Sequence, residues 1–280
     1  MTLDELYKSS VEKLKNIENI EIDVRIILKK VLSFSETDFL INKNRELSSH
    51  EVQTIGSMID KREKGIPVQY IIGEWDFYGT TFKVNDSVLI PRPETEILCE
   101  YVINYLRNKN EPVIADLCTG SGCIGITVKK YIGDATVVMV EKSPEAAEVC
   151  LENIKSILGN DKVFFINEDV FLSERFKQLP QFDVIVSNPP YIKSSEISSL
   201  QSEVLFEPEI ALDGGDDGLD FYRLFAEKWT EHLKPDGMFA FECGEDQAND
   251  IKSILEEKNF DVYIKNDYNN IERFVIGKRR

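Results

Sequence analysis

The chain has 280 residues, of which 42% are hydrophobic and 30% are charged. A chain of this length and composition can bury a substantial core, which excludes a disordered protein and favours one large domain or two smaller ones. The formal net charge of -17 disfavours nonspecific binding to nucleic acids and to anionic membranes, because both carry negative charge themselves.

The sequence shows no signal for a membrane span, for secretion or for a metal site. No apolar stretch approaches the ~20 residues that cross a bilayer, and Met1 is followed by the polar run TLDELYKSS. The cysteines lack paired metal-ligand spacing. They are Cys99, Cys118, Cys123, Cys150 and Cys243. We therefore expect a reduced, cytoplasmic protein without a bound metal.

Residues 2–66 predict a small helical bundle. Apolar residues recur in this segment at spacings of three and four, as they do on one face of a helix. Thr2 and Ser48 are expected N-caps, because Glu5 and Glu51 stand three positions after them, as in a capping box.

Residues 67–95 have a different composition. The segment PVQYIIGEWDFYGTTFKVNDSVLIPRPET is rich in aromatic and β-branched residues and is interrupted by Gly73, Gly79 and the pair Asn85 and Asp86. This pattern favours strands or a hairpin that joins two domains.

The rest of the chain alternates predicted strands and helices. Strands are expected at 113–117, 137–140, 163–166, 182–186 and 238–242, with a closing pair near 261–265 and 273–277. Helices are expected after the first strand through 128, and at 144–157, 221–233 and 247–258. The alternation predicts an α/β fold with a doubly wound, mostly parallel sheet that binds ligands at the carboxyl ends of its strands.

The first of these strands runs into DLCTGSGCIG, where Gly120, Gly122 and Gly125 complete the pattern G-x-G-x-x-G. Glycines let the chain turn tightly and approach a ligand, and the following helix presents unpaired amide groups. The second strand ends in Glu141, whose carboxylate can accept hydrogen bonds from ribose hydroxyls. The pattern predicts a nucleoside-containing cofactor, and a nicotinamide cofactor is still compatible with it.

The strand at 182–186 ends in Ser-Asn-Pro-Pro-Tyr. Two consecutive prolines stiffen the backbone and donate no hydrogen bonds, so nearby carbonyl groups are free to face a ligand. The side-chain oxygen of Asn188 and the carbonyl of Pro189 can each accept one N–H of a planar NH₂ group, and the ring of Tyr191 can cover it. The motif predicts a site that orients an amide or an exocyclic amine for attack on an electrophilic methyl group.

These motifs, together with IPRPETE (90–96), FEPEIALDGGDDGLDFYR (206–223) and LKPDGMFAFECGEDQ (233–247), resemble the HemK/PrmC family of release-factor glutamine methyltransferases. The resemblance covers nearly the whole chain. It implies a class I, Rossmann-like methyltransferase with a helical substrate-recognition domain at 1–72, a β-hairpin linker at 73–95 and a methyltransferase domain at 96–280. We expect it to act as a monomer in the cytoplasm.

The implied reaction is protein-(glutamine) N-methylation. S-adenosylmethionine donates a methyl group to the side-chain amide nitrogen of the Gln in the Gly-Gly-Gln motif of bacterial class I peptide release factors, and S-adenosylhomocysteine is the product. The implied catalytic and substrate-binding residues are Asn188, Pro189, Pro190 and Tyr191, with Arg92 and Glu94 beside the cleft. The implied cofactor-binding residues are Asp116, Cys118, Thr119, Gly120, Ser121, Gly122, Glu141, Asp169, Val170 and Asn188.

The chain departs from the family pattern at two positions. Cys118 stands where the family usually has Gly, so its Cβ restricts the backbone. Glu141 stands where the family usually has Asp, and its side chain is one methylene longer. Both changes bear on the fine geometry of the site rather than on the class of cofactor.

Three other functions stay open at this point. A related enzyme methylates a glutamine of a ribosomal protein, and an adenine methyltransferase would hold the exocyclic amine of a flipped-out base at Asn188. The acidic composition argues against a nucleic-acid substrate. A non-catalytic binding module could retain the fold, although the intact Asn-Pro-Pro-Tyr argues against lost catalysis.

Several other residues receive structural interpretations. We expect His50 and His232 to be surface or capping residues, and Cys123 and Cys150 to be small buried apolar groups rather than nucleophiles. The acidic run GGDDG at 214–218 lacks the terminal carboxylate of a calcium loop and is expected to form a turn.

Overall fold

The computed structural model describes residues 1–15, 17–159, 163–172 and 176–280. The chain divides into two compact units. The helical unit consists of Met1–Glu74 with Gln201–Phe206, and the sheet unit consists of Trp75–Leu200 with Glu207–Arg280. The short segment Gln201–Phe206 therefore belongs with the helices although it lies far along the chain, which the sequence did not predict.

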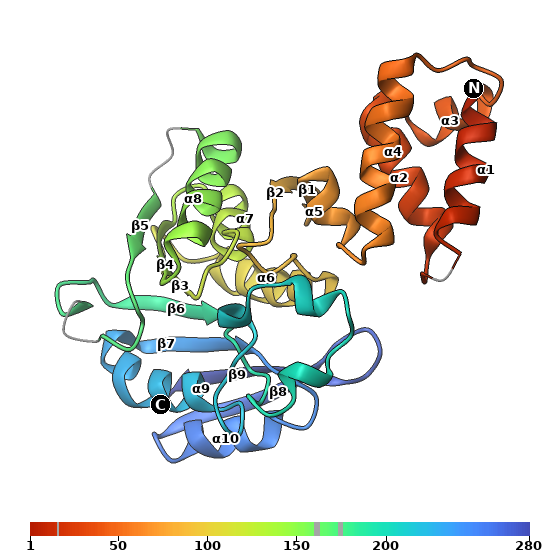
Figure 1. Ribbon diagram of the computed structural model, residues 1–280. Coiled ribbons are helices and arrows are strands. Elements are labelled where there is room, and N and C mark those ends of the chain that lie inside the picture. The colour runs from red at the N-terminus through yellow and green to blue at the C-terminus, as the bar shows by residue number, and fades with distance from the viewer. Residues whose placement is uncertain (16, 160–162, 173–175) are drawn as a thin grey trace. The chain divides into compact units, whose positions relative to one another are not determined.

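The helical unit is built from short amphipathic helices, shown in red to orange in Figure 1. They are α1 (Leu3–Lys13), α2 (Ile20–Leu32), α3 (Glu36–Ile41), α4 (Ser49–Glu63) and α5 (Val68–Ile72). The side chains of Thr2 and Ser48 accept hydrogen bonds from the backbone of Glu5 and Glu51, so the two predicted capping boxes are confirmed. Ser35 caps α3 in the same way.

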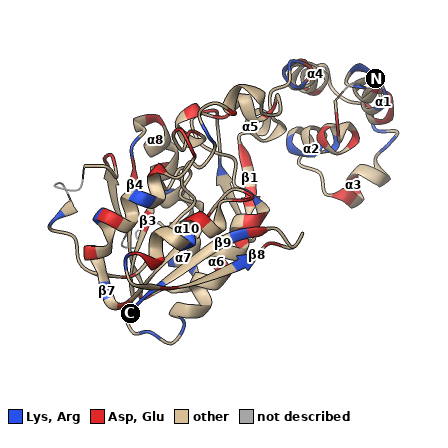
Figure 2. Ribbon diagram, turned by 90° about the horizontal axis from the view of Figure 1, so that it is seen from below, with Lys and Arg blue, Asp and Glu red and all other residues tan. Residues whose placement is uncertain are grey.

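The core of the helical unit is apolar, with one buried ion pair. Val24, Ile27 and Ile55 are fully or almost fully buried. Arg62 donates from Nε to Asp23 at 2.6 Å and also pairs with Glu203 of the returning segment. Figure 2 shows Lys and Arg as well as Asp and Glu on α1, α2 and α4, so the outer faces of these helices carry charges of both signs.

Residues Val68–Ile72 form a helix, so the expectation of extended structure from Pro67 onward is wrong for them. Pro67 precedes the helix with a φ of -53°, and Gly73 ends it in the left-handed conformation. Val68 and Ile71 are buried three residues apart, on the helix face that packs into the core. Tertiary burial thus outweighs the β-propensity of these branched residues.

The predicted hairpin follows this helix. Its strands are β1 (Glu74–Phe77) and β2 (Thr80–Lys83), and both turn residues, Tyr78 and Gly79, have positive φ. Two residues with positive φ characterise the tight turns that connect hairpin strands.

In the described residues, the main sheet of the sheet unit has seven strands in the order β5-β4-β3-β6-β7-β9-β8. They are β3 (Val113–Leu117), β4 (Thr136–Glu141), β5 (Val163–Asn167), β6 (Phe182–Ser187), β7 (Leu233–Glu242), β8 (Phe260–Asn266) and β9 (Glu272–Arg279). The first five are parallel and the last two pair antiparallel. The predicted α/β fold with a doubly wound, mostly parallel sheet is confirmed (Figure 1).

Helices cover both faces of this sheet. They are α6 (Pro93–Leu106), α7 (Cys123–Tyr131), α8 (Pro144–Asn153), α9 (Asp220–Leu224) and α10 (Ala248–Glu256). One apolar cluster joins α6, α7 and α8 to one face through Ile114, Val184 and Val186. A second cluster joins α9 and α10 to the other face through Ile185 and Phe241. Consecutive residues of β6, Val184, Ile185 and Val186, point to opposite faces of the sheet and are all apolar, so both faces are covered by helices.

The helix expected at 221–233 ends earlier than predicted. After α9, the chain makes a π-helical turn at Phe225–Trp229 and a 3-10 turn at Thr230–His232, and Leu233 already belongs to β7. Leu233 pairs with Phe182 at the start of the strand, which accounts for its apolar character. The helix predicted at 144–157 likewise changes to a π-helical turn at Ile154.

His232 is buried, so the surface role predicted for it is wrong. Its ring lies 5.3 Å from that of Trp229, and burial lowers the pKa of the imidazole. His50 is exposed, as expected.

Candidate active site

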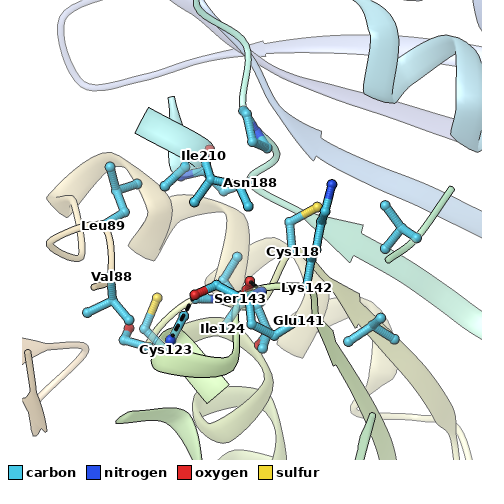
Figure 3. A pocket seen from close by; sticks show the side chains of 18 of the residues that line it. Val88, Leu89, Cys118, Cys123, Ile124, Glu141, Lys142, Ser143, Asn188 and Ile210 are labelled. Carbon is cyan, nitrogen blue, oxygen red and sulfur yellow. Dashed lines mark hydrogen bonds between the residues drawn. The ribbon is translucent and has the colours of Figure 1, made fainter. Parts of the chain in front are cut away.

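A cavity of about 250 Å³ lies in the sheet unit at the carboxyl ends of β3, β4 and β6. The predicted site residues that line it are Arg92, Cys118, Thr119, Gly120, Ser121, Glu141, Asp169, Val170, Asn188 and Pro190. Figure 3 shows Val88 and Leu89 on one side of this pocket and Cys118 and Lys142 on the other. The other predicted site residues, Glu94, Asp116, Gly122, Pro189 and Tyr191, are not among those that line it.

The loop after β3 adopts left-handed conformations at three positions. Cys118 has a φ of 58°, Gly120 of 55° and Gly122 of 84°. Side chains with a Cβ rarely adopt such angles, so Cys118 carries backbone strain that a Gly would avoid. The loop still closes, because Gly122 donates from its backbone to the carbonyl of Thr119 at 2.8 Å. The Cys therefore takes the conformation that Gly would take at this position.

Gly122 and Gly125 lie in close packing contact with neighbouring side chains. A Cβ on Gly122 would lie 2.8 Å from the sulfur of Cys150, and a Cβ on Gly125 would lie 2.9 Å from Oδ2 of Asp116. These close approaches allow α7 to begin directly against the sheet.

Asp116 supports the loop from beneath. Its Oδ2 accepts hydrogen bonds from the backbone of Gly125 at 2.8 Å and from the hydroxyl of Thr119. Burial raises the pKa of this carboxyl to about 7. Its Oδ1 is buried and has no partner among the described residues.

Glu141 lies at the end of β4 and joins the glycine loop to the next turn. Its two carboxylate oxygens accept hydrogen bonds from the backbones of Gly120 and Ser143, each at 2.9 Å. Burial raises the pKa of Glu141 above its ordinary value. Each oxygen retains a second lone pair, so the carboxylate can accept further hydrogen bonds at the pocket.

Asp169 also lines the pocket and contacts the residue after Glu141. Its carboxylate pairs with Lys142 at 2.9 Å and accepts a hydrogen bond from the backbone of Phe171 at 3.0 Å. The following residue, Val170, is buried and lines the pocket with an apolar side chain. This part of the pocket therefore combines an apolar surface with a carboxylate.

The Asn-Pro-Pro-Tyr motif follows β6 directly. Asn188 donates from Nδ2 to the hydroxyl of Thr95 at 3.3 Å, and its Oδ1 is buried with no partner among the described residues. A buried acceptor without a partner costs free energy unless a ligand supplies the donor. Gln247 donates from Nε2 to the carbonyl of Tyr191 at 2.8 Å and so holds the motif from behind.

The segment before α6, which includes Ile90 and Arg92, contacts Glu207, in the chain after β6. Arg92 lines the pocket and pairs with the buried carboxylate of Glu207, which also accepts a hydrogen bond from the backbone of Ile90 at 3.2 Å. Glu94 is partly buried and does not line the pocket. The structure thus brings Arg92 to the site and leaves Glu94 beside it.

The sequence analysis did not single out four residues that support the site: Thr95, Glu207, Glu242 and Gln247. Each stands in a segment with family-like sequence, but its partner is far along the chain, and periodicity does not reveal such contacts. Thr95 and Glu242, for example, are 147 positions apart and share a hydrogen bond of 2.6 Å.

Residues 5–73 match the family model described as the PrmC N-terminal domain, and residues 94–214 match the methyltransferase small domain. A release factor glutamine methyltransferase of Clostridium acetobutylicum is 38% identical over 99% of this chain and 98% of its own length. This chain belongs to the release factor glutamine methyltransferase family. A second release factor glutamine methyltransferase, from Aquifex aeolicus, is 38% identical over 96% of the chain and 95% of its own length.

Two solved structures share the fold of this chain at low sequence identity. The catalytic domain of hMettl16, solved with the MAT2A 3'UTR hairpin 6, superposes with a TM-score of 0.59 at 13% identity over 84% of each chain. A methyltransferase from Pyrococcus furiosus superposes with a TM-score of 0.52 at 18% identity, over 72% of this chain and 90% of its own. These two matches show a shared fold, whereas the enzyme class rests on the curated relatives.

Two further observations concern the described part of the chain. None of its helices has both the length and the apolar character of a membrane span. Its His, Cys, Asp and Glu side chains form no group of three or more that could hold a metal ion. Near Gly214–Gly218, Asp213 instead accepts a hydrogen bond from the backbone of Gly215, as in a turn.

Proposed function

We propose that the chain transfers a methyl group from S-adenosylmethionine to the side-chain amide nitrogen of the Gln in the Gly-Gly-Gln motif of bacterial class I peptide release factors. The observation that carries the proposal is Oδ1 of Asn188, a buried acceptor without a described partner, on a residue that lines the pocket. A primary amide supplies the missing donor. Membership of the family identifies that amide as a glutamine side chain.

The residues of the pocket fit the proposed cofactor. Gly120 lines the pocket and leaves open space where a side chain would stand, so the backbone can approach the cofactor closely, and Glu141 keeps lone pairs for ribose hydroxyls. Val170 and Asp169 supply an apolar surface and a polar edge for the adenine ring. When bound, S-adenosylmethionine supplies a methyl group on a positively charged sulfur.

The residues of the motif act on the glutamine amide. The nitrogen of an amide is a weak nucleophile, because its lone pair is delocalised into the carbonyl group. In the proposed complex, Oδ1 of Asn188 and the carbonyl of Pro189 each accept one N–H, which orients the amide and favours the positive charge that develops on nitrogen. The nitrogen would gain the methyl group and release one proton to water, and the electron pair of the broken C–S bond would remain on the sulfur of S-adenosylhomocysteine.

A transfer assay with labelled S-adenosylmethionine tests this proposal. Purified protein is expected to label a class I release factor, and to leave unlabelled a release factor whose Gly-Gly-Gln glutamine is changed to alanine. Equal labelling of that variant, or labelling of nucleic acid or a ribosomal protein alone, contradicts the proposal.

An Asn188→Ala variant separates catalysis from binding. We expect it to bind the cofactor with nearly unchanged affinity and to lose transfer by about 100-fold or more, as removal of one oriented hydrogen-bonding group at a reacting centre does. Asn249→Ala removes an exposed asparagine on α10 and serves as the matched control. Equal activities of the two variants contradict the proposed role of Asn188.

A further inference from the structure

Three elements meet behind Asn188. The strands β6 and β7 are parallel neighbours with Ser187 opposite Phe241, so Asn188 and Glu242 follow at adjacent strand ends. Thr95 lies in the first turn of α6 and reaches both: its hydroxyl donates to Oε2 of Glu242 at 2.6 Å and lies 3.3 Å from Nδ2 of Asn188. Thr95 and Glu242 are each only 2% exposed, so water does not replace either partner.

The hydroxyl of Thr95 has a single proton, and this decides which end of the Asn188 amide faces it. An ionised Glu242 can only accept, so the hydroxyl proton goes to the carboxylate. The hydroxyl oxygen can then only accept, and it requires the NH₂ group of Asn188. The reverse orientation of the amide would place two oxygen acceptors against one proton, which is unfavourable in a buried site.

We infer that Thr95 and Glu242 are positioning residues that fix the amide of Asn188 with its Oδ1 turned away from Thr95 and available to the substrate, an inference that rests on the proposed function. Neither residue touches the reacting atoms in this account. Their contribution is to hold the acceptor in one orientation before the substrate arrives, so that binding need not reorder it.

The orientation depends on the charge of Glu242. A protonated Glu242 can donate to Thr95, whose own proton is then free for Oδ1 of Asn188, and the amide is stabilised in the reversed orientation. Burial raises the pKa of Glu242 to about 7. We therefore expect kcat to fall as the pH drops through this range.

Other ionisable groups face Glu242 and bear on its titration. The charged ones are Arg92 and Glu94 at the start of α6 and Arg273 on β9. The neutral ones are Cys99, Cys123, Tyr191, Tyr222 and Cys243. Burial raises the pKa of each of these five groups, so they stay uncharged where Glu242 titrates.

Kinetics of four variants test the inference. Thr95→Val and Glu242→Gln are each expected to lower kcat about tenfold or more, with unchanged KM for the release factor. Thr95→Val removes the hydroxyl that accepts from Asn188, and Glu242→Gln places a neutral side chain that can donate to Thr95, as a protonated carboxyl can. Thr95→Ser keeps the hydroxyl and is expected to restore kcat. Thr127→Val is the matched control, because the Thr127 hydroxyl is buried on α7 without a described partner. Loss of activity in Thr95→Ser equal to that in Thr95→Val overturns the inference.

The pH profile distinguishes positioning from a structural role. The kcat of the wild-type enzyme is expected to fall as the pH drops below about 7. The kcat of Glu242→Gln is expected to lack this dependence on pH. A Glu242→Gln enzyme whose kcat keeps the wild-type acid limb overturns the inference.

A measurement without turnover keeps the inference separate from the proposed function. Nuclear magnetic resonance of protein labelled with ¹⁵N at asparagine detects the side-chain NH₂ groups. The signal of Asn188 is assigned as the one that is absent from the spectrum of Asn188→Ala. We expect it to shift with the titration of Glu242, to shift in Thr95→Val and to stay in place in Thr95→Ser. If the wild-type enzyme fails to methylate release factors, the proposed function fails, while this signal still reports the contact. A signal insensitive to Thr95→Val and to pH overturns the inference on its own.

Discussion

Gln247 donates a hydrogen bond from its side-chain Nε2 to the main-chain carbonyl of Tyr191 at 2.8 Å. The same nitrogen lies 3.3 Å from the carbonyl of Gly218, and Oε1 accepts a hydrogen bond from the backbone of Gly244 at 2.9 Å. One side chain therefore connects the Asn-Pro-Pro-Tyr motif, the GGDDG turn and the residues after β7. Prolines fix the motif locally, but this contact fixes it to the rest of the sheet unit.

Removal of this contact is expected to impair catalysis without preventing folding. In Gln247→Ala, the partly buried carbonyl of Tyr191 loses its donor, so the free energy of unfolding should fall by ~1–2 kcal/mol. We expect kcat to fall about tenfold, because the motif is less firmly held. Steady-state kinetics and urea unfolding measure both effects. Asn249→Ala, an exposed change nearby on α10, is the control, and equal kcat values for the two variants would contradict the prediction.

The GGDDG turn supports the motif by close packing. A Cβ on Gly214 would lie 2.7 Å from the Cα of Tyr191 and 2.9 Å from the carbonyl oxygen of Pro190. Both are backbone atoms, so Gly214→Ala must displace the motif itself. We expect a loss of activity of about 100-fold and a loss of stability of ~1–3 kcal/mol, as for other overpacked sites.

Gly133→Ala provides the comparison for this substitution. No heavy atom lies within 4 Å of a Cβ at Gly133, and its φ is not in the left-handed region. We expect kcat and the unfolding midpoint of this variant to match the wild type. If Gly214→Ala retains full activity, the turn does not position the motif.

The sequence predicted the strands and the loop of the site because their signals are local. The run VIADL followed by glycines specifies a strand, a tight turn and a helix within about twenty residues, and a strand followed by two prolines specifies a rigid end. The burial of Asp116 beneath the loop, the contact of Thr95 with Glu242 and the helix at Val68–Ile72 depend on residues distant in the chain. Propensity does not encode such partners, so only the folded structure reveals them.

Asp116 makes the stability of the sheet unit depend on pH. Burial raises the pKa of its carboxyl to about 7, so the folded state binds a proton more tightly than the unfolded state does. Its contribution is greatest below the unfolded pKa of about 4 and is lost as the pH rises through about 7. In Asp116→Asn this loss is absent, so the variant should gain stability relative to the wild type by up to roughly 4 kcal/mol between those values.

Chemical unfolding of both proteins across this pH range measures the difference. Glu242 titrates in both proteins, so subtraction isolates Asp116. The acceptor oxygen that serves Thr119 and Gly125 remains in the Asn variant. A difference in stability that does not change with pH would show that Asp116 is charged in the folded enzyme.

The helical unit depends on the buried pair of Arg62 and Asp23. Arg62 is 2% exposed and Asp23 is 7% exposed, so neither charge is solvated if its partner is removed. Arg62→Met should therefore lower the free energy of unfolding of this unit by ~3–5 kcal/mol. The double variant Asp23→Leu with Arg62→Met removes both charges and should recover most of the loss.

The two tryptophans make this change measurable in the intact chain. Trp75 and Trp229 both belong to the sheet unit, so tryptophan fluorescence follows that unit, while far-ultraviolet circular dichroism also follows the helices. For Arg62→Met we expect an earlier transition by circular dichroism and an unchanged one by fluorescence. Lys8→Met breaks the exposed pair with Asp4 and should cost less than ~1 kcal/mol. If Arg62→Met costs no more than Lys8→Met, the buried pair does not stabilise the helical unit.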